Sequence, residues 1–238
     1  HGLPFDADGI KARYPGVFFS QFSGAELVAE KWKLSREMLD EFALSSHQKA
    51  ANATENKYFD QEIVPVQGKN SENNDSMVLQ DEGIRFDASF EALSGLNPVT
   101  EGGVITAGNA SQITDGAAAV LVCNDAGLKK IKCDPLVKVK GISVVGDDPI
   151  LMLTGPIPAT KKVLSESKLN IDEIGLYEVN EAFAPVPLAW EIEVKADRSK
   201  LNVNGGAMAL GHPLGASGAK LMTTLIYEMH RRNEKYGL

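Results

Sequence analysis

The stretch from Asn202 to Lys220, which reads NVNGGAMALGHPLGASGAK, constrains this chain more than any other part of it. Its glycines at positions 205, 206 and 211 permit positive φ and a close approach to the main chain, so we expect a shaped loop. Pro213 pushes the preceding residue out of helical conformations and itself suits the first turn of a helix. The pattern predicts an extended His212 at the mouth of a helix that begins near Leu214.

His212 is a candidate general base. At a helix N-terminus the dipole disfavours the imidazolium and favours a neutral ring that accepts a proton near pH 7. A capping or packing role is the alternative, and spacing alone leaves both open. The small residues from Gly215 to Ala219 indicate that another backbone packs there, which predicts a buried helix start. The glycines match neither nucleotide-binding pattern, Gly-x-Gly-x-x-Gly or Gly-x-x-x-x-Gly-Lys-Ser/Thr.

Composition narrows the classes of protein that this chain can belong to. With 238 residues, 43% of them hydrophobic, it can bury a substantial core. A net charge of −8 argues against nucleic acid as the main partner, and no apolar run is long enough to span a membrane. Cys123 and Cys133 lack metal-ligand spacing, so we expect no metal site. We interpret both as structural thiols in a reducing compartment, the cytoplasm, with an organelle such as a mitochondrion or peroxisome left open.

Periodicity and turn residues predict a mixed α/β chain. We expect an ordered loop over 1–22 and a surface position for His47. Polar residues 68–75 should connect a hairpin, and a helix that begins after Asp87 should break at Asn97-Pro98. Further helices are expected at 24–33, from a Ser35 cap to about 54, at 125–130 and at 160–167. Strand-like runs lie at 62–66, 76–80, 117–122, 136–142 and 174–179.

Two of these runs predict where a site forms. Residues 117–122 are continuously apolar, as in a central strand buried on both faces, and Cys123 ends that run. Residues 174–179 end at Asn180. Ligands of open α/β sheets bind beyond the carboxyl ends of strands, so Asn180 is placed to point its amide into a crevice. An ordinary helix N-cap is the alternative for this residue.

Three motifs taken together resemble the thiolases, which are acyl-CoA C-acyltransferases. They are VNEAFA at 179–184, NGGA with GHP and GASG between 204 and 218, and TAGNAS at 106–111. The resemblance extends from Ser20 to Leu238. It implies an α/β thiolase fold, a five-layer αβαβα core with an inserted loop domain. Residues 1–113 correspond to that loop domain, 114–134 to the end of the N-terminal half, and 135–238 to an incomplete C-terminal half.

The resemblance also implies an activity, the cleavage of 3-ketoacyl-CoA by CoA or the reverse condensation, through an acyl-cysteine. His212 matches the histidine that activates the thiol and helps bind the thioester oxygen, and Asn180 matches the asparagine that holds a water in the same oxyanion hole. Ser111 and Ala107 match the segment at the CoA pantetheine arm, and Arg85 an arginine near the CoA nucleotide. The resemblance further implies that CoA and acetyl-CoA are substrates and that no cofactor is bound permanently. It also implies a homodimer or homotetramer that works in fatty acid β-oxidation.

Some features depart from the family pattern. The nucleophilic cysteine is expected before His1 and a second cysteine, in Cys-x-Gly-Gly-Gly, after Leu238, so both ends look internal to a longer chain. Ser20-Gln21 replaces a His-Met pair of acetoacetyl-CoA-specific members, which favours a degradative enzyme for longer or bulkier acyl groups. Pro185 and Pro187 argue against a regular helix start after Asn180. An acetoacetyl-CoA-forming acetyl-CoA C-acetyltransferase, a non-catalytic module that binds acyl-CoA or lipid, and an assembly subunit are the alternatives.

Overall fold

The computed structural model describes residues 4–69 and 72–238. Helices dominate, and the strands β1 (Val66–Lys69) and β2 (Asp75–Val78) form a two-stranded antiparallel ladder. The α-helices are α1 (Asp8–Arg13), α2 (Gln21–Lys31), α3 (Arg36–Glu55), α4 (Phe90–Ser94), α5 (Asp125–Ile131), α6 (Pro156–Ser167), α7 (Pro185–Val194), α8 (Ala207–Leu210) and α9 (Ser217–Arg232). The 3-10 turns are η1 (Pro4–Asp6), η2 (Ile171–Glu173) and η3 (Arg198–Lys200).

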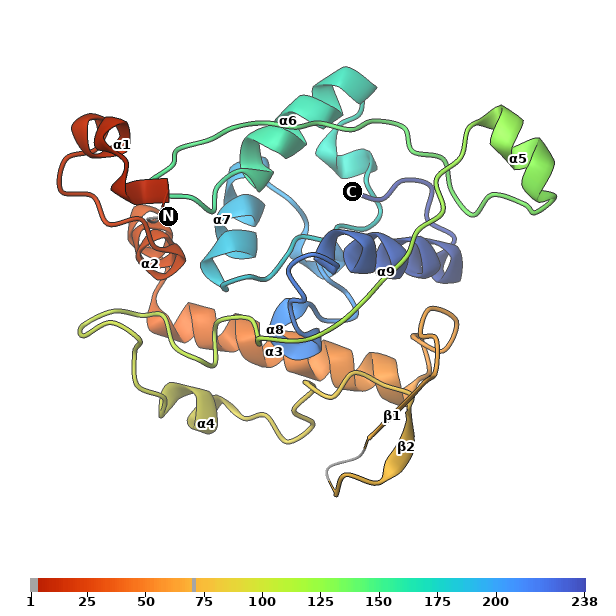
Figure 1. The fold of residues 1–238 in the computed structure, drawn as a ribbon, viewed down its shortest axis with the longest axis horizontal. Coiled ribbons are helices and arrows are strands. Elements are labelled where there is room, and N and C mark those ends of the chain that lie inside the picture. The colour runs from red at the N-terminus through yellow and green to blue at the C-terminus, as the bar shows by residue number, and fades with distance from the viewer. Residues whose placement is uncertain (1–3, 70–71) are drawn as a thin grey trace.

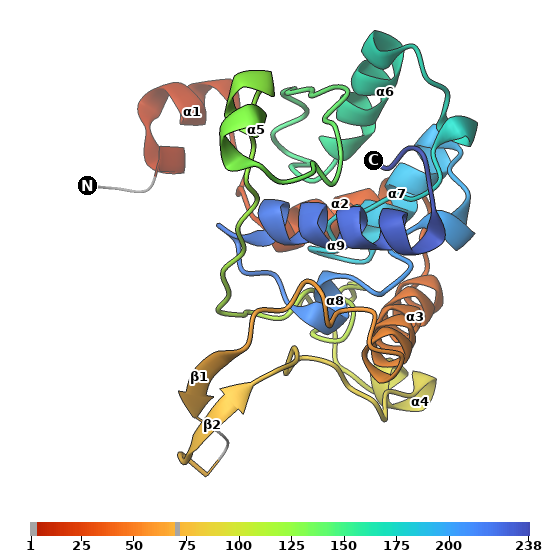
Figure 2. The same cartoon turned by 90° about the vertical axis from the view of Figure 1, so that its right-hand side faces the viewer.

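The helices form layers around the C-terminal half of the chain. Helix α3 crosses the lower part of the molecule with α8 next to it and α4 below it, α7 and α9 occupy the middle, and α6 lies near the top (Figures 1 and 2). Helix α3 packs on α4 and α8, and α7 packs on α2 and α6. The β1–β2 hairpin and α5 project from this body in both views. Among the described residues, every helix is too short or too polar to cross a bilayer.

Helix α3 follows its sequence closely. The Ser35 hydroxyl caps it by accepting from the Met38 N–H at 3.3 Å, and the expected apolar face, which includes Leu39 and Phe42, is buried. His47 lies on that same face and is buried, so the expected surface position is wrong. The segment after the hairpin covers it, since the Arg85 N–H donates to His47 Nδ1 at 3.2 Å.

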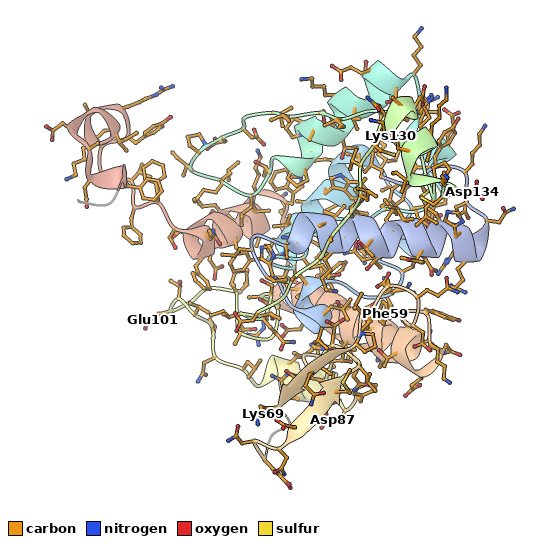
Figure 3. All side chains as sticks on the ribbon, turned by 45° about the vertical axis from the view of Figure 1, so that its right-hand side comes forward. Phe59, Lys69, Asp87, Glu101, Lys130 and Asp134 are labelled. Carbon is orange, nitrogen blue, oxygen red and sulfur yellow. The ribbon has the colours of Figure 1, made fainter. Side chains whose placement is uncertain are left out.

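The expected hairpin forms, but its first strand covers 66–69 in place of 62–66, so residues 68, 69 and 75, which were expected in the connection, belong to the strands. Residues 62–65 precede it in a turn and coil, and the register pairs Val66 with Val78 and Lys69 with Asp75. Residues 70 and 71, in the expected connection, lie outside the described residues. Figure 3 shows Lys69 on the projecting hairpin and Phe59 close to α3. Phe59 is buried there in a small second core.

Residues 174–179 form the extended centre of the C-terminal half. Tyr177 makes an isolated parallel bridge with Leu201, and Leu176 makes one with Gly237. The expected extended run is therefore present, although its pairing is limited to single bridges. Tyr177 also packs edge-on against Trp190 of α7, with ring centroids 5.3 Å apart. The run is thereby held between the loop at 201, the C-terminal residues and α7.

Residues 117–122 and 136–142 are not strands, contrary to expectation. The first run passes along the outer side of α9 toward α5, and Figure 3 shows Lys130 and Asp134 in that projecting region. Leu121 is 75% exposed, because a strand needs a hydrogen-bonding neighbour and this run has none among the described residues. Cys123 and Cys133 are exposed free thiols, so the structural, core-strand role expected for Cys123 is wrong as well.

Several helix boundaries differ from expectation for local reasons. Helix α7 begins at Pro185, and the prolines do not disrupt it because the first amides of a helix need no intrahelical acceptor. Helix α9 begins at Ser217, three residues later than expected, and Gly215 and Gly218 are exposed, so the predicted buried start is wrong for this structure. The loop expected over 1–22 contains η1, α1 and the beginning of α2, and residues 1–3 lie outside the described part.

Candidate active site

His212 lies in the turn between α8 and α9, outside any helix or strand, and is half-buried. Gly211 before it has φ +84°, and a side chain at that position would collide with Thr114, so glycine is required. The His212 N–H donates to the Gln112 carbonyl at 3.2 Å, which ties the turn to the segment that follows Ser111. Burial lowers the pKa of the His212 imidazole below its ordinary value. The ring is therefore neutral at physiological pH and able to accept a proton.

The structure brings Asn180 to His212 across 32 residues of sequence. Asn180 Nδ2 lies 3.3 Å from His212 Nε2. The other amide atom, Asn180 Oδ1, is buried and has no partner among the described residues. Asn180 also lines a cavity of about 20 Å³ together with Gly206 and Ser217. That volume suits one water molecule and is far too small for an acyl group.

Ser111 is joined to the loop that carries Asn180. Its N–H donates to the Ala182 carbonyl at 2.9 Å, and Ala110 and Phe183 form an isolated antiparallel bridge. Ala107 lies apart from them, exposed on the turn at 107–108. Arg85 is exposed too, on the segment that His47 holds. The structure thus groups His212, Asn180 and Ser111, and leaves Ala107 and Arg85 at the surface.

Gln112 connects these segments and was not singled out by sequence reasoning. Its Nε2 donates to the carbonyls of Gly83 and Met208, both at 2.8 Å. One side chain therefore joins the Arg85 segment, the Ser111 segment and α8. Its place directly after the serine of TAGNAS was the available signal.

Ser217 is a second residue that sequence reasoning missed as a functional candidate. Its Oγ lies 2.6 Å from His212 Nδ1 and 3.0 Å from the Pro213 carbonyl oxygen. The sequence placed it among small residues interpreted as packing, although a hydroxyl five residues after a histidine in a turn can reach back to the ring. Ser217 is buried, so this contact is shielded from solvent.

Glu181 is the third missed residue, and it organises the loops on either side of the site. Its carboxylate accepts from Ser46 Oγ of α3 at 2.6 Å, from Asn202 Nδ2 at 2.9 Å and from the Met208 N–H at 3.2 Å. Asn202 in turn accepts from the Val179 N–H at 2.9 Å and donates to the Val179 carbonyl at 2.8 Å. The residues on both sides of Asn180 are therefore held by buried hydrogen bonds.

These hydrogen bonds hold the Glu181 carboxyl group in a buried position, where its charged form is disfavoured. Glu181 is 1% exposed, and burial raises its pKa, while the hydrogen bonds from Ser46, Asn202 and Met208 act in the opposite direction. A side chain on Gly206 would collide with the Glu181 carboxyl, so the close approach of the 205–206 turn depends on glycine. The motif thus has two causes: Gly206 packs on Glu181, and Gly205, at φ +79°, approaches Ser46 and Ala50 of α3.

Helices packed around a central extended run, with the paired histidine and asparagine in loops at its end, resemble the strand-end sites of α/β proteins. Family models agree with this description. The model for the thiolase N-terminal domain matches residues 14–126, and the model for the thiolase C-terminal domain matches residues 133–238. The chain belongs to the thiolase family.

Individual relatives lead to the same family. A protein named steroid 3-ketoacyl-CoA thiolase FadA6, from Mycobacterium tuberculosis, is 49% identical over 95% of this chain and 54% of its own length. The acetyl-CoA acetyltransferase of Cupriavidus necator is 43% identical over 90% of this chain and 55% of its own length. The chain therefore spans about half the length of the curated relatives that it matches.

Solved structures confirm the thiolase fold. The crystal structure of the Bacillus anthracis acetyl-CoA acetyltransferase has a TM-score of 0.88 at 39% identity, covering 94% of this chain and 57% of that one. Human mitochondrial 3-ketoacyl-CoA thiolase in complex with CoA has a TM-score of 0.86 at 42% identity, covering 90% and 53%. This chain accordingly contains part of the thiolase fold.

Proposed function

We propose that this chain carries the histidine and asparagine loops of an acyl-CoA C-acyltransferase that cleaves 3-ketoacyl-CoA with CoA, or runs the reverse condensation. The observation that carries the proposal is the approach of Asn180 Nδ2 to His212 Nε2, at 3.3 Å. The Ser111 segment is bonded to the Asn180 loop and the next residue to the His212 turn. This combines a base, an amide donor and a segment that resembles a CoA contact.

The roles follow from the chemistry of acyl transfer. A neutral His212 takes the proton of a thiol, and the thiolate attacks the 3-keto carbonyl of the substrate. The bond between C2 and C3 then breaks, acetyl-CoA leaves as its enolate and takes up a proton, and the thiol of CoA accepts the acyl group from the acyl-cysteine that remains. Asn180 contributes to an oxyanion site, where donors are needed as negative charge develops on oxygen. The thiol is assigned, from the family resemblance, to a cysteine outside residues 1–238. Cys123 and Cys133 lie in the exposed region around α5 and are not proposed for this role.

The substrate range is the next part of the proposal. Ser20 and Gln21, at the start of α2, favour longer or bulkier acyl groups over acetoacetyl-CoA, and a relative at 49% identity is named for steroid 3-ketoacyl-CoA. Comparing turnover of acetoacetyl-CoA with that of long or polycyclic 3-ketoacyl-CoA substrates separates this reading from an acetyl-CoA C-acetyltransferase. Faster turnover of acetoacetyl-CoA than of every longer substrate would favour the acetyltransferase.

Other expectations from the resemblance are retained as proposals. We propose that CoA contacts Ser111 and Ala107, with Arg85 near its nucleotide, and that no cofactor is bound permanently. The protein is proposed to work as a homodimer or homotetramer in fatty acid β-oxidation, in the cytoplasm or a reducing organelle. The division into 1–113, 114–134 and 135–238 likewise stays a prediction.

Replacing His212 tests the proposed function directly. In the intact protein, His212→Ala should lower the turnover of 3-ketoacyl-CoA by about 10² to 10⁴, the range for loss of a positioned base. His230→Ala is the matched control, because His230 lies at the far end of α9 and bonds only the Leu136 carbonyl. It should leave turnover nearly unchanged. A near-normal rate for His212→Ala would exclude the catalytic role.

Replacing Ser111 tests the CoA contact. A bulky residue, as in Ser111→Phe, should raise the KM for CoA more than it lowers kcat, because a contact with the pantetheine arm is made equally in the ground and transition states. Steady-state kinetics with varied CoA measures both constants. A fall in kcat at unchanged KM would instead place Ser111 in the chemistry.

A further inference from the structure

Four polar groups form a chain of contacts that runs from Asn180 through the His212 ring to the backbone at the start of α9. In order, the contacts are Asn180 Nδ2 to His212 Nε2 at 3.3 Å, His212 Nδ1 to Ser217 Oγ at 2.6 Å, and Ser217 Oγ to the Pro213 carbonyl oxygen at 3.0 Å. The direction of the protons along this chain determines which ring nitrogen of His212 can act as a base.

The Pro213 carbonyl favours one direction, because it can only accept. It already accepts from the Ala216 and Ser217 N–H groups at 2.8 and 2.9 Å, and the Ser217 hydroxyl makes a third contact with it at 3.0 Å. When the Ser217 hydroxyl donates to it, the remaining lone pairs of Oγ face Nδ1, and Nδ1 must carry the ring proton. Nε2 is then bare and accepts from the Asn180 amide. All three contacts become hydrogen bonds in this arrangement.

If the protons point the opposite way along the chain, fewer of the three contacts become hydrogen bonds. If Ser217 donated to Nδ1, the Ser217 and Pro213 oxygens would face each other at 3.0 Å without a hydrogen between them. Nε2 would then carry the proton and require the Asn180 amide to be turned over. Only two of the three contacts would be satisfied, and Nε2 would have no lone pair for a thiol.

We infer that Ser217 is a positioning residue that holds the His212 ring in the Nδ1–H form, so that the lone pair of Nε2 faces Asn180 and accepts a proton when a thiol replaces the Asn180 amide at that nitrogen. This inference rests on the proposed function for its catalytic meaning, but the proton position itself is independent of any activity. Ser217 is suited to the role because it is buried and is the first residue of α9, where the helix holds it in place. It touches the base and not the reacting atoms.

The first experiment measures the tautomer. Long-range ¹H–¹⁵N spectra of the imidazole groups in the intact protein, with His212→Gln used to assign the signal, should show a protonated Nδ1 and a bare Nε2 near pH 8. Ser217→Ala should shift His212 toward the Nε2–H form, and Ser217→Thr, which keeps a hydroxyl, should retain the Nδ1–H form. A protonated Nε2 in the unmodified protein would overturn the inference without any need for a variant.

The second experiment separates positioning from general structural support. Ser217→Ala should lower kcat by about 10- to 100-fold, less than complete loss of the base, with the KM for CoA within about twofold, and Ser217→Thr should recover most of the rate. Equal rates for the unmodified protein and Ser217→Ala would overturn the catalytic meaning. An Nδ1–H tautomer in a protein that lacks thiolase activity would instead reject the proposed function and leave the inference about Ser217 intact.

Discussion

Two apolar runs, residues 117–122 and 174–179, look alike in sequence and differ completely in the structure. Both read as strands, and both precede a segment that turns into a helix. Leu121 in the first run is 75% exposed, whereas Leu176 in the second is 2% exposed. Apolar character alone therefore does not place a run in a core.

The difference lies in the partners of the backbone. Tyr177 bridges to Leu201 and Leu176 to Gly237, and beyond these bridges the Asn202 side chain continues the pairing by bonding both the N–H and the carbonyl of Val179. Residues 117–122 have no comparable partner in the part of the chain that the structure describes. An extended run can be buried only where its backbone N–H and carbonyl groups have partners, so the paired run lies in the core and the unpaired run stays exposed to water.

The largest expected effect is the loss of unfolding free energy when Asn202 is replaced by alanine. Asn202→Ala leaves the Val179 N–H and carbonyl buried without partners and places alanine at φ 43°, so we expect a loss of about 4 kcal/mol of unfolding free energy. Urea unfolding of the intact protein measures it.

Asn233→Ala provides the matched control for that substitution. Asn233 also has positive φ, 57°, but is exposed at the end of α9, so it should lose only about 1 kcal/mol. Similar losses at the two positions would show that backbone strain, and not the pairing with Val179, dominates at Asn202.

The next prediction compares two leucines, Leu176 in the buried run and Leu121 in the exposed run. Leu176→Ala should cost about 3 kcal/mol, as for a buried leucine, while Leu121→Ala should stay within about 0.5 kcal/mol. Urea unfolding of both variants provides the values. Equal destabilisation would break the comparison, because it would mean that residues 117–122 are buried and paired in solution.

The smallest expected effect concerns the carboxyl group of Glu62, which packs against α9. Glu62 accepts from Thr224 Oγ1 at 2.9 Å, and burial raises its pKa from 4.5 to about 7, with Lys220 opposing and Asp81 and Glu228 adding to the rise. The folded state holds this proton more tightly than the unfolded state. The contribution is therefore fully present below pH 4.5 and is lost as the pH rises through about 7.

Glu62→Gln should accordingly stabilise the protein at pH 8 by about 1 kcal/mol, less than the full shift implies because Glu62 is only half-buried, and should change little at pH 5. Thermal unfolding at both pH values measures this. Glu193→Gln is the control, since Glu193 is exposed and bonded by Lys161 and Trp32, and it should not stabilise at pH 8. A stabilisation of Glu62→Gln at pH 5 as large as that at pH 8 would reject the assigned proton.

Much of the local structure could be predicted from the residues. The Ser35 cap, the helix expected at 125–130 and the glycine of positive φ before His212 follow from short-range rules, and the structure confirms them. A hairpin forms as expected, although its strands have other bounds. The assignment of His212 and Asn180 as candidates also came from the sequence, through strand-end logic and the resemblance. The roles assigned to them stay predictions until activity is measured.

Partners distant in sequence could not be predicted. His47 was expected at the surface, but the segment around Arg85, 38 residues away in sequence, packs on it and bonds its ring. Glu181 and Ser217 were passed over because their hydrogen-bond partners, Ser46 and the His212 ring, are decided by how α3 and the turn at 211–216 pack.

The sequence by itself therefore determined the family, the helices and the glycine turn that presents His212, because these depend on residue type and near neighbours. The tertiary structure decided which apolar run is buried, which carboxyl is enclosed and which hydroxyl faces the imidazole. Hydrogen bonding and burial between distant segments settle those questions, since each requires a partner that local preference cannot supply.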